Sequence, residues 1–192
     1  MPLHLPMNLL VKIITLERVA ELADVNEEIV RQYFELKGYF VQTDVLYLKP
    51  KGKTGKKSSG YGDIDLIIVH PKTGDKAVVG VSGWHRERIT PSYVEGWEGR
   101  LFSFLSPLAL NRAAQVLGTR KFRKILVISQ LGSTISSKEN FLREAKRMGV
   151  DQVIEFPSIL KELIKLIKTE PSYDSEVLQT LRLLKIYGLL EV

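Results

Sequence analysis

The sequence predicts an α/β domain of three layers, in which helices cover both faces of a central mixed β-sheet of about five strands. Nearly continuous apolar runs at residues 64–69 and 77–81 are typical of strands that are buried on both faces. Segments with helical periodicity and capping signals separate the strand-like runs. A chain of 192 residues is long enough to bury one substantial core.

The first half of the chain is expected to hold two helices and three strands. Residues 15–25 form a short helix, and a second helix begins with Asn26 as its N-cap and ends before Gly38. Residues 39–48 are rich in aromatic and β-branched side chains and predict a strand, which a loop over residues 49–60 follows. Residues 63–70 and 76–84 predict an antiparallel hairpin.

If Thr73 and Gly74 are the central residues of the hairpin turn, Asp65 lies opposite Ser82. In the same register Ile67 lies opposite Gly80. The turn therefore fixes which side chains of the two strands become neighbours.

The second half is expected to alternate helices with two strands. The pattern Ser136-x-x-Glu139 is typical of a capping box at a helix start. The predicted helices cover residues 91–105, 108–117, 136–149, 158–168 and 175–187, and the predicted strands cover residues 124–130 and 150–156. We therefore divide the chain into an N-terminal extension with a short helix (1–25), an α/β core (26–157) and C-terminal helices packed on that core (158–192).

Composition restricts the available chemistry. The sequence contains no Cys, which excludes disulfides, thiolate zinc sites and thiol catalysis, and we expect a cytoplasmic protein. Residues 1–10 lack a basic start and contain two prolines, so we expect no signal peptide, and no apolar run reaches the roughly 20 residues of a membrane helix. The formal net charge of +6 at pH 7 is consistent with a polyanionic partner.

Two carboxylates interrupt an otherwise apolar predicted strand. Asp63 and Asp65 are two residues apart, so strand periodicity places both side chains on one face. Carboxylates in such a place are costly without a partner. Two interpretations remain open: both residues bind a metal ion, or Asp63 caps a turn while Asp65 pairs with a nearby Lys.

Three segments between residues 26 and 157 carry a resemblance to a known family. Glu27 precedes Gly38-Tyr39, residues 62–67 read GDIDLI, and residues 79–84 read VGVSGW. These segments resemble the PD-(D/E)xK, or restriction-endonuclease-like, nucleases. Glu27 and Gly38-Tyr39 are similar to the family's helix Glu and to the Gly-aromatic pair that begins its first strand. Residues 62–67 resemble its G-(D/E)-I-D-L-(I/V) strand, and residues 79–84 resemble its V-E-V-K-G-W strand. That superfamily includes Holliday-junction resolvases.

The resemblance implies a Mg²⁺-dependent nuclease centre with two essential groups replaced. Asp65 would be a metal ligand, assisted by Glu27 and Asp63. The Glu and Lys of the family stand where this chain has Gly80 and Ser82. Both a ligand and the cation that stabilises the transition state are therefore missing from their usual positions.

Other groups are candidates to replace the two missing ones. Asp63 shares the predicted face of Asp65, and Lys76 lies on that face six residues from Ser82. Glu95 or Glu98 could enter from the following helix. None of these replacements is required by the pattern.

Basic residues flank the predicted site on both sides in the sequence. Lys51, Lys53, Lys56 and Lys57 lie in a Gly- and Ser-rich segment, and Arg86 and Arg88 follow the third predicted strand. Such residues contact nucleic-acid phosphates. The alternatives are a solvated surface loop for the lysines and ion pairs with nearby Glu residues for the arginines.

Three functional hypotheses follow. The first is a protein that binds DNA, or RNA, through a restriction-endonuclease-like fold and is catalytically impaired or inactive. The second is an active Mg²⁺-dependent endonuclease with a rearranged site. The third is a structural or protein-interaction module. Separately, residues 178–190 hold more leucines than one solvated helix needs, so we expect that end to pack on the domain or on another subunit, as in a homodimer.

Overall fold

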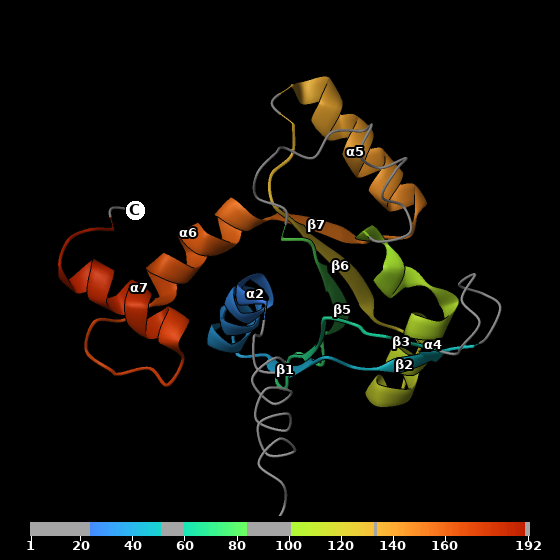
Figure 1. The fold of residues 1–192 in the computed structure, drawn as a ribbon, viewed down its shortest axis with the longest axis horizontal. Helices are drawn as coiled ribbons and strands as arrows, with labels where there is room; N and C mark the ends of the chain where they lie inside the picture. The colour runs from blue at the N-terminus through green and yellow to red at the C-terminus, as the bar shows by residue number, and fades with distance from the viewer. Residues whose placement is uncertain (1–23, 51–59, 84–100, 133, 191–192) are drawn as a thin grey trace, which may run out of the picture.

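A five-stranded mixed sheet lies at the centre of the computed structural model, which describes residues 24–50, 60–83, 101–132 and 134–190. The strand order is β1-β4-β5-β6-β7. β4 pairs antiparallel with both β1 and β5, whereas β5, β6 and β7 are parallel (Figure 1). The strands are β1 (Phe40–Thr43), β4 (Leu66–Val69), β5 (Lys76–Val81), β6 (Arg123–Ile128) and β7 (Gln152–Glu155).

Helices cover both faces of this sheet, so the predicted α/β fold class with a central mixed sheet is confirmed. One face carries α2 (Val25–Leu36), α6 (Phe156–Leu166) and α7 (Glu176–Ile186), and the other carries η1 (Ser103–Leu105), α4 (Pro107–Leu117) and α5 (Ile135–Arg147). Within the described residues, no helix is long and apolar enough to cross a membrane.

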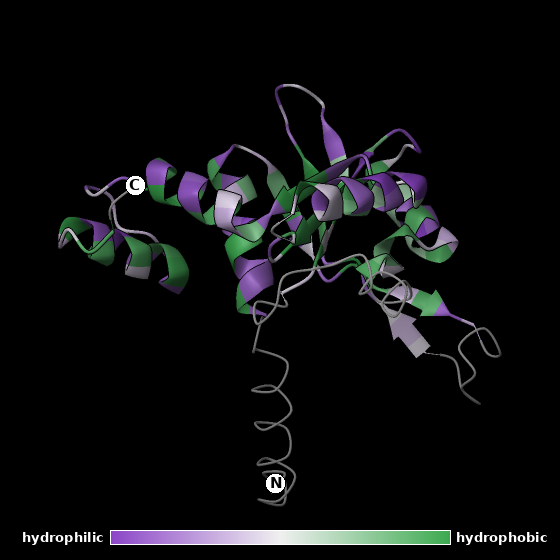
Figure 2. Cartoon of the chain, turned by 90° about the horizontal axis from the view of Figure 1, so that it is seen from above, coloured by the Kyte–Doolittle hydropathy of each residue, from purple (hydrophilic) through white to green (hydrophobic). Residues whose placement is uncertain are grey.

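Alternation along the strands divides the buried side chains into two cores. Leu66 and Ile68 of β4 face the layer of α2 and α6, whereas Ile67 between them faces the layer of α4 and α5. Figure 2 shows apolar and polar residues alternating along the helices that pack on the sheet. The continuous apolar runs of the sequence reflect this two-sided burial.

Short polar side chains cap α2, α4, α5 and α7, although two of these caps differ from the predicted ones. Asp24, rather than Asn26, caps α2 and accepts a hydrogen bond from the Asn26 N–H at 2.9 Å. Thr134, rather than Ser136, caps α5 and accepts from the Ser137 N–H. In both cases the acceptor lies two residues earlier in the chain than the predicted cap and binds a free N–H group of the first turn.

The predicted strand over residues 39–48 is two strands. Asp44 has a φ of 53°, a left-handed conformation that interrupts the strand between β1 and β2 (Tyr47–Lys49). β2 pairs antiparallel with β3 (Gly60–Gly62). The sequence predicted no strand at β3, because the predicted loop ends at residue 60 and the next predicted strand begins at residue 63. We call these two strands the β2–β3 hairpin; it is a separate small sheet beside α4 (Figure 1).

The predicted register of the β4–β5 hairpin is wrong by two residues. Leu66 pairs with Val79 and Val69 with Lys76, so Asp65 falls opposite Gly80 rather than Ser82. The reason lies in the turn, where the His70 N–H donates to the Asp75 oxygen and the Gly74 N–H donates to the His70 oxygen. This four-residue loop places the centre of the turn one position earlier than the predicted two-residue turn does.

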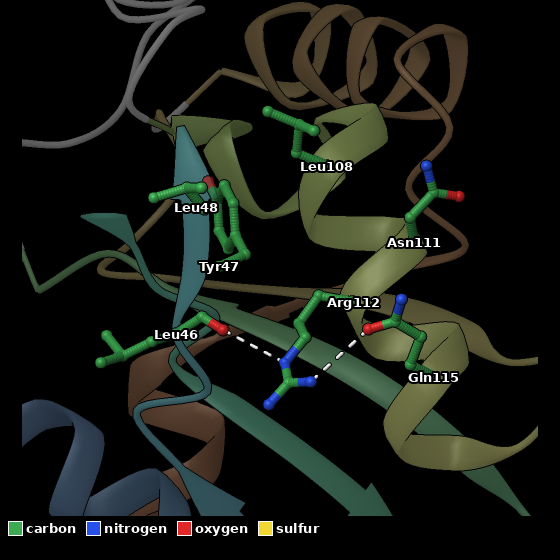
Figure 3. A pocket seen from close by; sticks show the side chains of 7 residues that line it. All are labelled: Leu46, Tyr47, Leu48, Leu108, Asn111, Arg112 and Gln115. Atoms are coloured by element: carbon green, nitrogen blue, oxygen red, sulfur yellow. Dashed lines mark hydrogen bonds between the residues drawn. The ribbon is translucent and has the colours of Figure 1, made fainter. Parts of the chain in front are cut away.

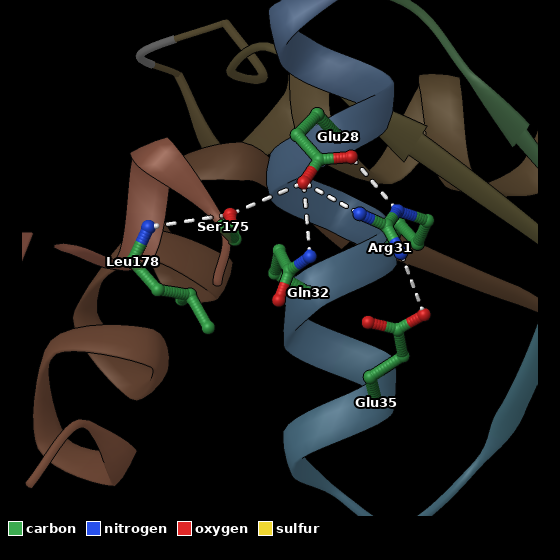
Figure 4. A network of polar contacts seen from close by, with 6 residues as sticks. All are labelled: Glu28, Arg31, Gln32, Glu35, Ser175 and Leu178. Atoms are coloured by element: carbon green, nitrogen blue, oxygen red, sulfur yellow. Dashed lines mark hydrogen bonds and ion pairs between the residues drawn. The ribbon is translucent and has the colours of Figure 1, made fainter. Parts of the chain in front are cut away.

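A polar network links α2 to the start of α7. Glu28 accepts hydrogen bonds from Arg31, Gln32 and Ser175, and Ser175 caps α7 (Figure 4). Leu178 is buried against the core, whereas Leu189 is 68% exposed. The C-terminal helix therefore packs on the same layer as α2, with apolar side chains left at its far end.

Candidate functional site

The first turn of α2 lies beside the end of β5, because Gly83 has no side chain. A Cβ at Gly83 would meet the side chain of Asn26. This close approach brings Glu27, the next residue of α2, to the region where β4 and β5 separate. The structure thus places Glu27 near Asp65, as the sequence analysis expected of a shared site.

Glu27 is surrounded by other carboxylates. Burial, and then repulsion from Asp65, Asp24, Asp44 and Asp63, together raise the pKa of Glu27 from 4.5 to about 7. Asp63 and Asp44 are exposed, whereas Glu27 and Asp65 are half-buried. Asp24 and Asp44 were not predicted members, because one was assigned to a short helix and the other to a continuous strand.

Asp65 ends the ladder between β4 and β5. In an antiparallel ladder every second pair of opposite residues exchanges backbone hydrogen bonds. His70 and Asp75 form such a pair beside the turn, so the same pattern would make Ile64 and Val81 a hydrogen-bonded pair at the other end of the strands. Instead Ile64 exchanges backbone hydrogen bonds with Val45, and the Asp65 carboxylate accepts from the Val81 N–H at 2.5 Å. Asp65 therefore has a structural role that needs no metal ion.

The surroundings of Asp65 also favour its protonated form. Burial is the largest cause that raises the pKa of Asp65; the hydrogen bond from Val81 opposes it, the charges of Asp63, Asp44 and Asp24 add to it, and the resulting pKa is about 6. Residues 63–65 precede β4 instead of belonging to it, so the predicted strand begins three residues too early. Their proximity to Glu27 comes from the chain bend before β4.

Across the ranges that the structure describes, no three carboxylate, imidazole or thiol side chains come close enough together to hold one metal ion. Glu27, Asp63 and Asp65 do not form such a group. Mg²⁺ commonly binds through one or two carboxylates and completes its shell with water and substrate phosphates. A magnesium site here would need ligands beyond these described carboxylates.

An aromatic ring occupies the space beside Gly80, where the resemblance would put a carboxylate. A Cβ at Gly80 would meet the ring of Phe104, which is 2% exposed and belongs to the core under α4 and α5. The space is therefore filled by apolar packing. Sequence reasoning missed Phe104, because nothing in the residues around it relates it to β5.

The end of β5 has neither the family's Lys, which is Ser82 in this chain, nor the amine of Lys76. Ser82 is half-buried and its backbone N–H donates to the Val127 oxygen at 2.9 Å, which continues the pairing with β6. Lys76, the candidate for a displaced amine, donates from Nζ to the Leu117 oxygen at 2.8 Å. Lys76 thus caps the C-terminus of α4 from the opposite end of β5.

Several predicted site residues lie outside the described residues. These are Lys51, Lys53, Lys56, Lys57, Arg86, Arg88, Glu95 and Glu98. The structure does describe Lys49 and Gly60, which end the two strands of the β2–β3 hairpin on either side of the four lysines.

Acidic residues are absent from two long stretches of the sequence, and these stretches meet in the fold. Residues 45–62 and 99–138 together hold twelve of the 28 basic residues and none of the 22 acidic ones. The first stretch contains the β2–β3 hairpin and the second contains α4, which packs on β2. The described basic residues of these elements are Lys49 and Arg112, whereas Arg123, Lys124 and Lys138 of the second stretch lie on β6 and α5 and form ion pairs with carboxylates from outside both stretches. We call the hairpin and α4 together the acid-free lobe; it lies next to the carboxylates around Glu27 through Val45 and Asp44.

Comparison of the chain with family models, curated proteins and solved structures found no match.

Proposed function

We propose that this protein binds nucleic acid through the acid-free lobe and that its nuclease-like centre is catalytically impaired. The carrying observation is the meeting of two acid-free stretches on the β2–β3 hairpin and α4. A surface with positive charges and no carboxylates attracts phosphates and releases their counterions on binding. DNA and RNA both provide this chemistry.

The packing at Gly80 supports impaired catalysis. Phosphodiester hydrolysis in a PD-(D/E)xK centre needs carboxylates that hold the metal ion and a cation that stabilises the developing charge. In this chain Phe104 fills the space beside Gly80, and Lys76 is engaged with α4. Loss of one electrostatic contributor of this kind commonly costs about 100-fold or more in rate.

The binding proposal predicts a steep salt dependence that depends on the lysines of the hairpin segment. Replacing Lys51, Lys53, Lys56 and Lys57 by Ala should lower the slope of log K against log salt by about 3 to 4, because each lost phosphate contact removes about 0.9 for duplex DNA. The measurement is fluorescence anisotropy of a labelled duplex titrated at several salt concentrations.

The matched control removes the same charge elsewhere. Lys146, Lys161, Lys165 and Lys168 are exposed on or beside α5 and α6, and replacing these four by Ala should leave the slope nearly unchanged. Equal effects of the two quadruple variants would mean that binding follows net charge alone. Absence of binding by the wild-type protein at low salt would refute the proposal and favour a protein-interaction module.

An active Mg²⁺-dependent endonuclease with a rearranged site is the second candidate, favoured by the raised pKa values of Glu27 and Asp65. A divalent cation would relieve the repulsion between two such carboxylates. Asp65→Asn keeps the shape of the side chain and should abolish any metal-dependent nicking of supercoiled DNA. Efficient nicking by the wild-type protein that Asp65→Asn abolishes would establish this candidate over the impaired one.

A further inference from the structure

A groove lies between β2 and α4. The groove has a volume of about 360 Å³, in the range of pockets that bind small ligands. Leu46 and Leu48 line it from the hairpin side, and Asn111, Arg112 and Gln115 line it from α4 (Figure 3). No carboxylate is among the described residues that line it.

Arg112 projects from α4 across this groove. Its Nε donates to the Leu46 oxygen at 3.2 Å, and a terminal nitrogen donates to Gln115 Oε1 at 3.5 Å (Figure 3). Within the described part of the chain, Arg112 forms no ion pair with an acidic residue. A guanidinium whose partners are all neutral still has N–H donors available, and these can bind a phosphate through charge-assisted hydrogen bonds.

The hairpin adds an apolar surface beside this cation. Leu46 and Leu48 are each 55% exposed, and Tyr61 is 71% exposed. Tyr61 pairs directly with Leu48 across the two strands, so both side chains lie on one face. Exposed aromatic rings on a strand are platforms on which unpaired bases stack.

We propose that a single-stranded segment of nucleic acid binds across the groove between β2 and α4 and the adjoining outer face of the hairpin, with Arg112 in the groove on a phosphate and Tyr61 on the outer face stacked on a base. This inference rests on the proposed function and deepens it by naming the strand state and the contacts. A groove that has a positive charge and no carboxylates among its described residues favours a polyanion over an uncharged apolar peptide.

The groove leads toward the carboxylates of the candidate centre. Arg112 contacts the carbonyl oxygen of Leu46, which is two residues from Asp44. The backbone N–H of Asp44 donates to the backbone carbonyl oxygen of Asp65 at 3.2 Å. A strand bound along β2 would therefore end beside Glu27 and Asp65. This continuity joins the groove to the rest of the proposed surface.

The experiment compares Arg112→Gln with Arg182→Gln as a matched control. Arg182 Nε also donates to a backbone oxygen, that of Thr169 at 2.8 Å, but from α7. The two variants lose the same charge and the same kind of hydrogen bond. Anisotropy with a labelled single-stranded oligonucleotide should show about tenfold weaker binding for Arg112→Gln and a slope of log K against log salt lower by about 0.7, with Arg182→Gln like wild type.

Two further variants keep the test independent of folding defects. Asn111→Asp is nearly isosteric at an exposed position and puts a negative charge into the groove, so it should also weaken single-strand binding. Tyr61→Ser should weaken binding at least about fivefold through lost stacking. Unchanged affinity of Arg112→Gln and Asn111→Asp, in a wild-type protein that binds, would overturn the groove and leave the proposed function standing.

Two other outcomes would also overturn the inference. Binding of duplex alone, with no measurable affinity for the single strand, would exclude the proposed strand state. A dimer in sedimentation equilibrium that Tyr61→Ser dissociates would assign the hairpin face to a second copy of the chain. Failure of the wild-type protein to bind any oligonucleotide would refute the proposed function itself.

Discussion

At the scale of single residues, Gly80 and Phe104 decide what the end of β5 can hold. The resemblance to the PD-(D/E)xK nucleases implies that position 80 lacks a metal ligand. In the structure the buried ring of Phe104 takes up the space into which a side chain at position 80 would extend. Introducing a Glu at position 80 and a Lys at position 82 would therefore also require a smaller residue at position 104.

The contact between Gly80 and Phe104 predicts a destabilising effect of a single methyl group. Gly80→Ala should lower the free energy of unfolding by about 1 to 3 kcal/mol, because the core must shift to admit the Cβ. The measurement is urea unfolding. Gly60→Ala is the control, since no atom lies within 4 Å of a Cβ built at Gly60.

A double-mutant cycle separates this contact from general effects on the core. In a Phe104→Ala background, which itself costs about 3 to 5 kcal/mol, the added cost of Gly80→Ala should largely vanish. Additive costs of the two substitutions would show that position 80 does not meet the Phe104 ring.

Glu27 gives the protein a pH dependence of definite sign. Its pKa is raised from 4.5 to about 7 in the native state, so the native state binds more protons than the unfolded chain between these values. The resulting stability is present below about pH 4.5 and is lost as the pH rises through 7. Asp65, with a pKa raised to about 6, acts in the same direction.

The Glu27→Gln variant should therefore be more stable than the wild type at pH 8, by about 1 to 2 kcal/mol after allowance for solvent screening. The two proteins should converge near pH 4, where Glu27 is protonated. Urea unfolding from pH 4 to 8 measures the difference, with Glu170→Gln between α6 and α7 as the control for charge removal. A difference between wild type and Glu27→Gln that does not change with pH would contradict the prediction.

At the scale of elements, Asp44 determines that the chain forms two strands where the sequence predicts one. Its left-handed backbone turns the chain out of the main sheet after β1 and into the β2–β3 hairpin. Asp tolerates this conformation better than most residues. The hairpin, and with it the groove beside α4, depends on this one residue.

Asp44→Val should consequently destabilise the protein by about 1 to 2 kcal/mol, because a β-branched residue is strained at a φ of 53°. Asp44→Asn tolerates the same backbone and removes the same charge, so it separates strain from electrostatics and should cost little. Thr43→Val, inside β1, is the control for a β-branched residue within the strand and should change stability by less than about 0.5 kcal/mol. Urea unfolding above pH 7 compares the variants, and equal costs for Asp44→Val and Asp44→Asn would show that strain at this residue is negligible.

At the scale of the whole molecule, two regions of different charge adjoin each other. The carboxylates gather around the start of α2, whereas the acid-free lobe combines the β2–β3 hairpin with α4. A nucleic-acid strand attracted by the lobe would lie against Leu46, close to the carboxylates. The Arg112 and Arg182 comparison tests this arrangement, because the two arginines differ in their place in the molecule and share their local chemistry.

The sequence by itself determined the layers, the mixed sheet and the approximate place of most helices and strands. These features depend on local periodicity, on caps such as that of α7 at Ser175, and on apolar runs such as those of β4 and β5. Glu27 and Asp65 were also identified from the sequence as neighbours, through the resemblance rather than through spacing. The membership in the PD-(D/E)xK superfamily that the resemblance implies stays a prediction.

Only the tertiary structure decided the register of β4 and β5, the break at Asp44, the partner of Asp65 and the packing beside Gly80. Each depends on residues that are distant in the chain or on the hydrogen bonds of one turn, which periodicity does not encode. Phe104 lies 24 positions after Gly80 in the sequence, yet it fills the space beside it in the fold. The physical reason is that close packing joins side chains across elements, so the content of a site follows from the fold as a whole.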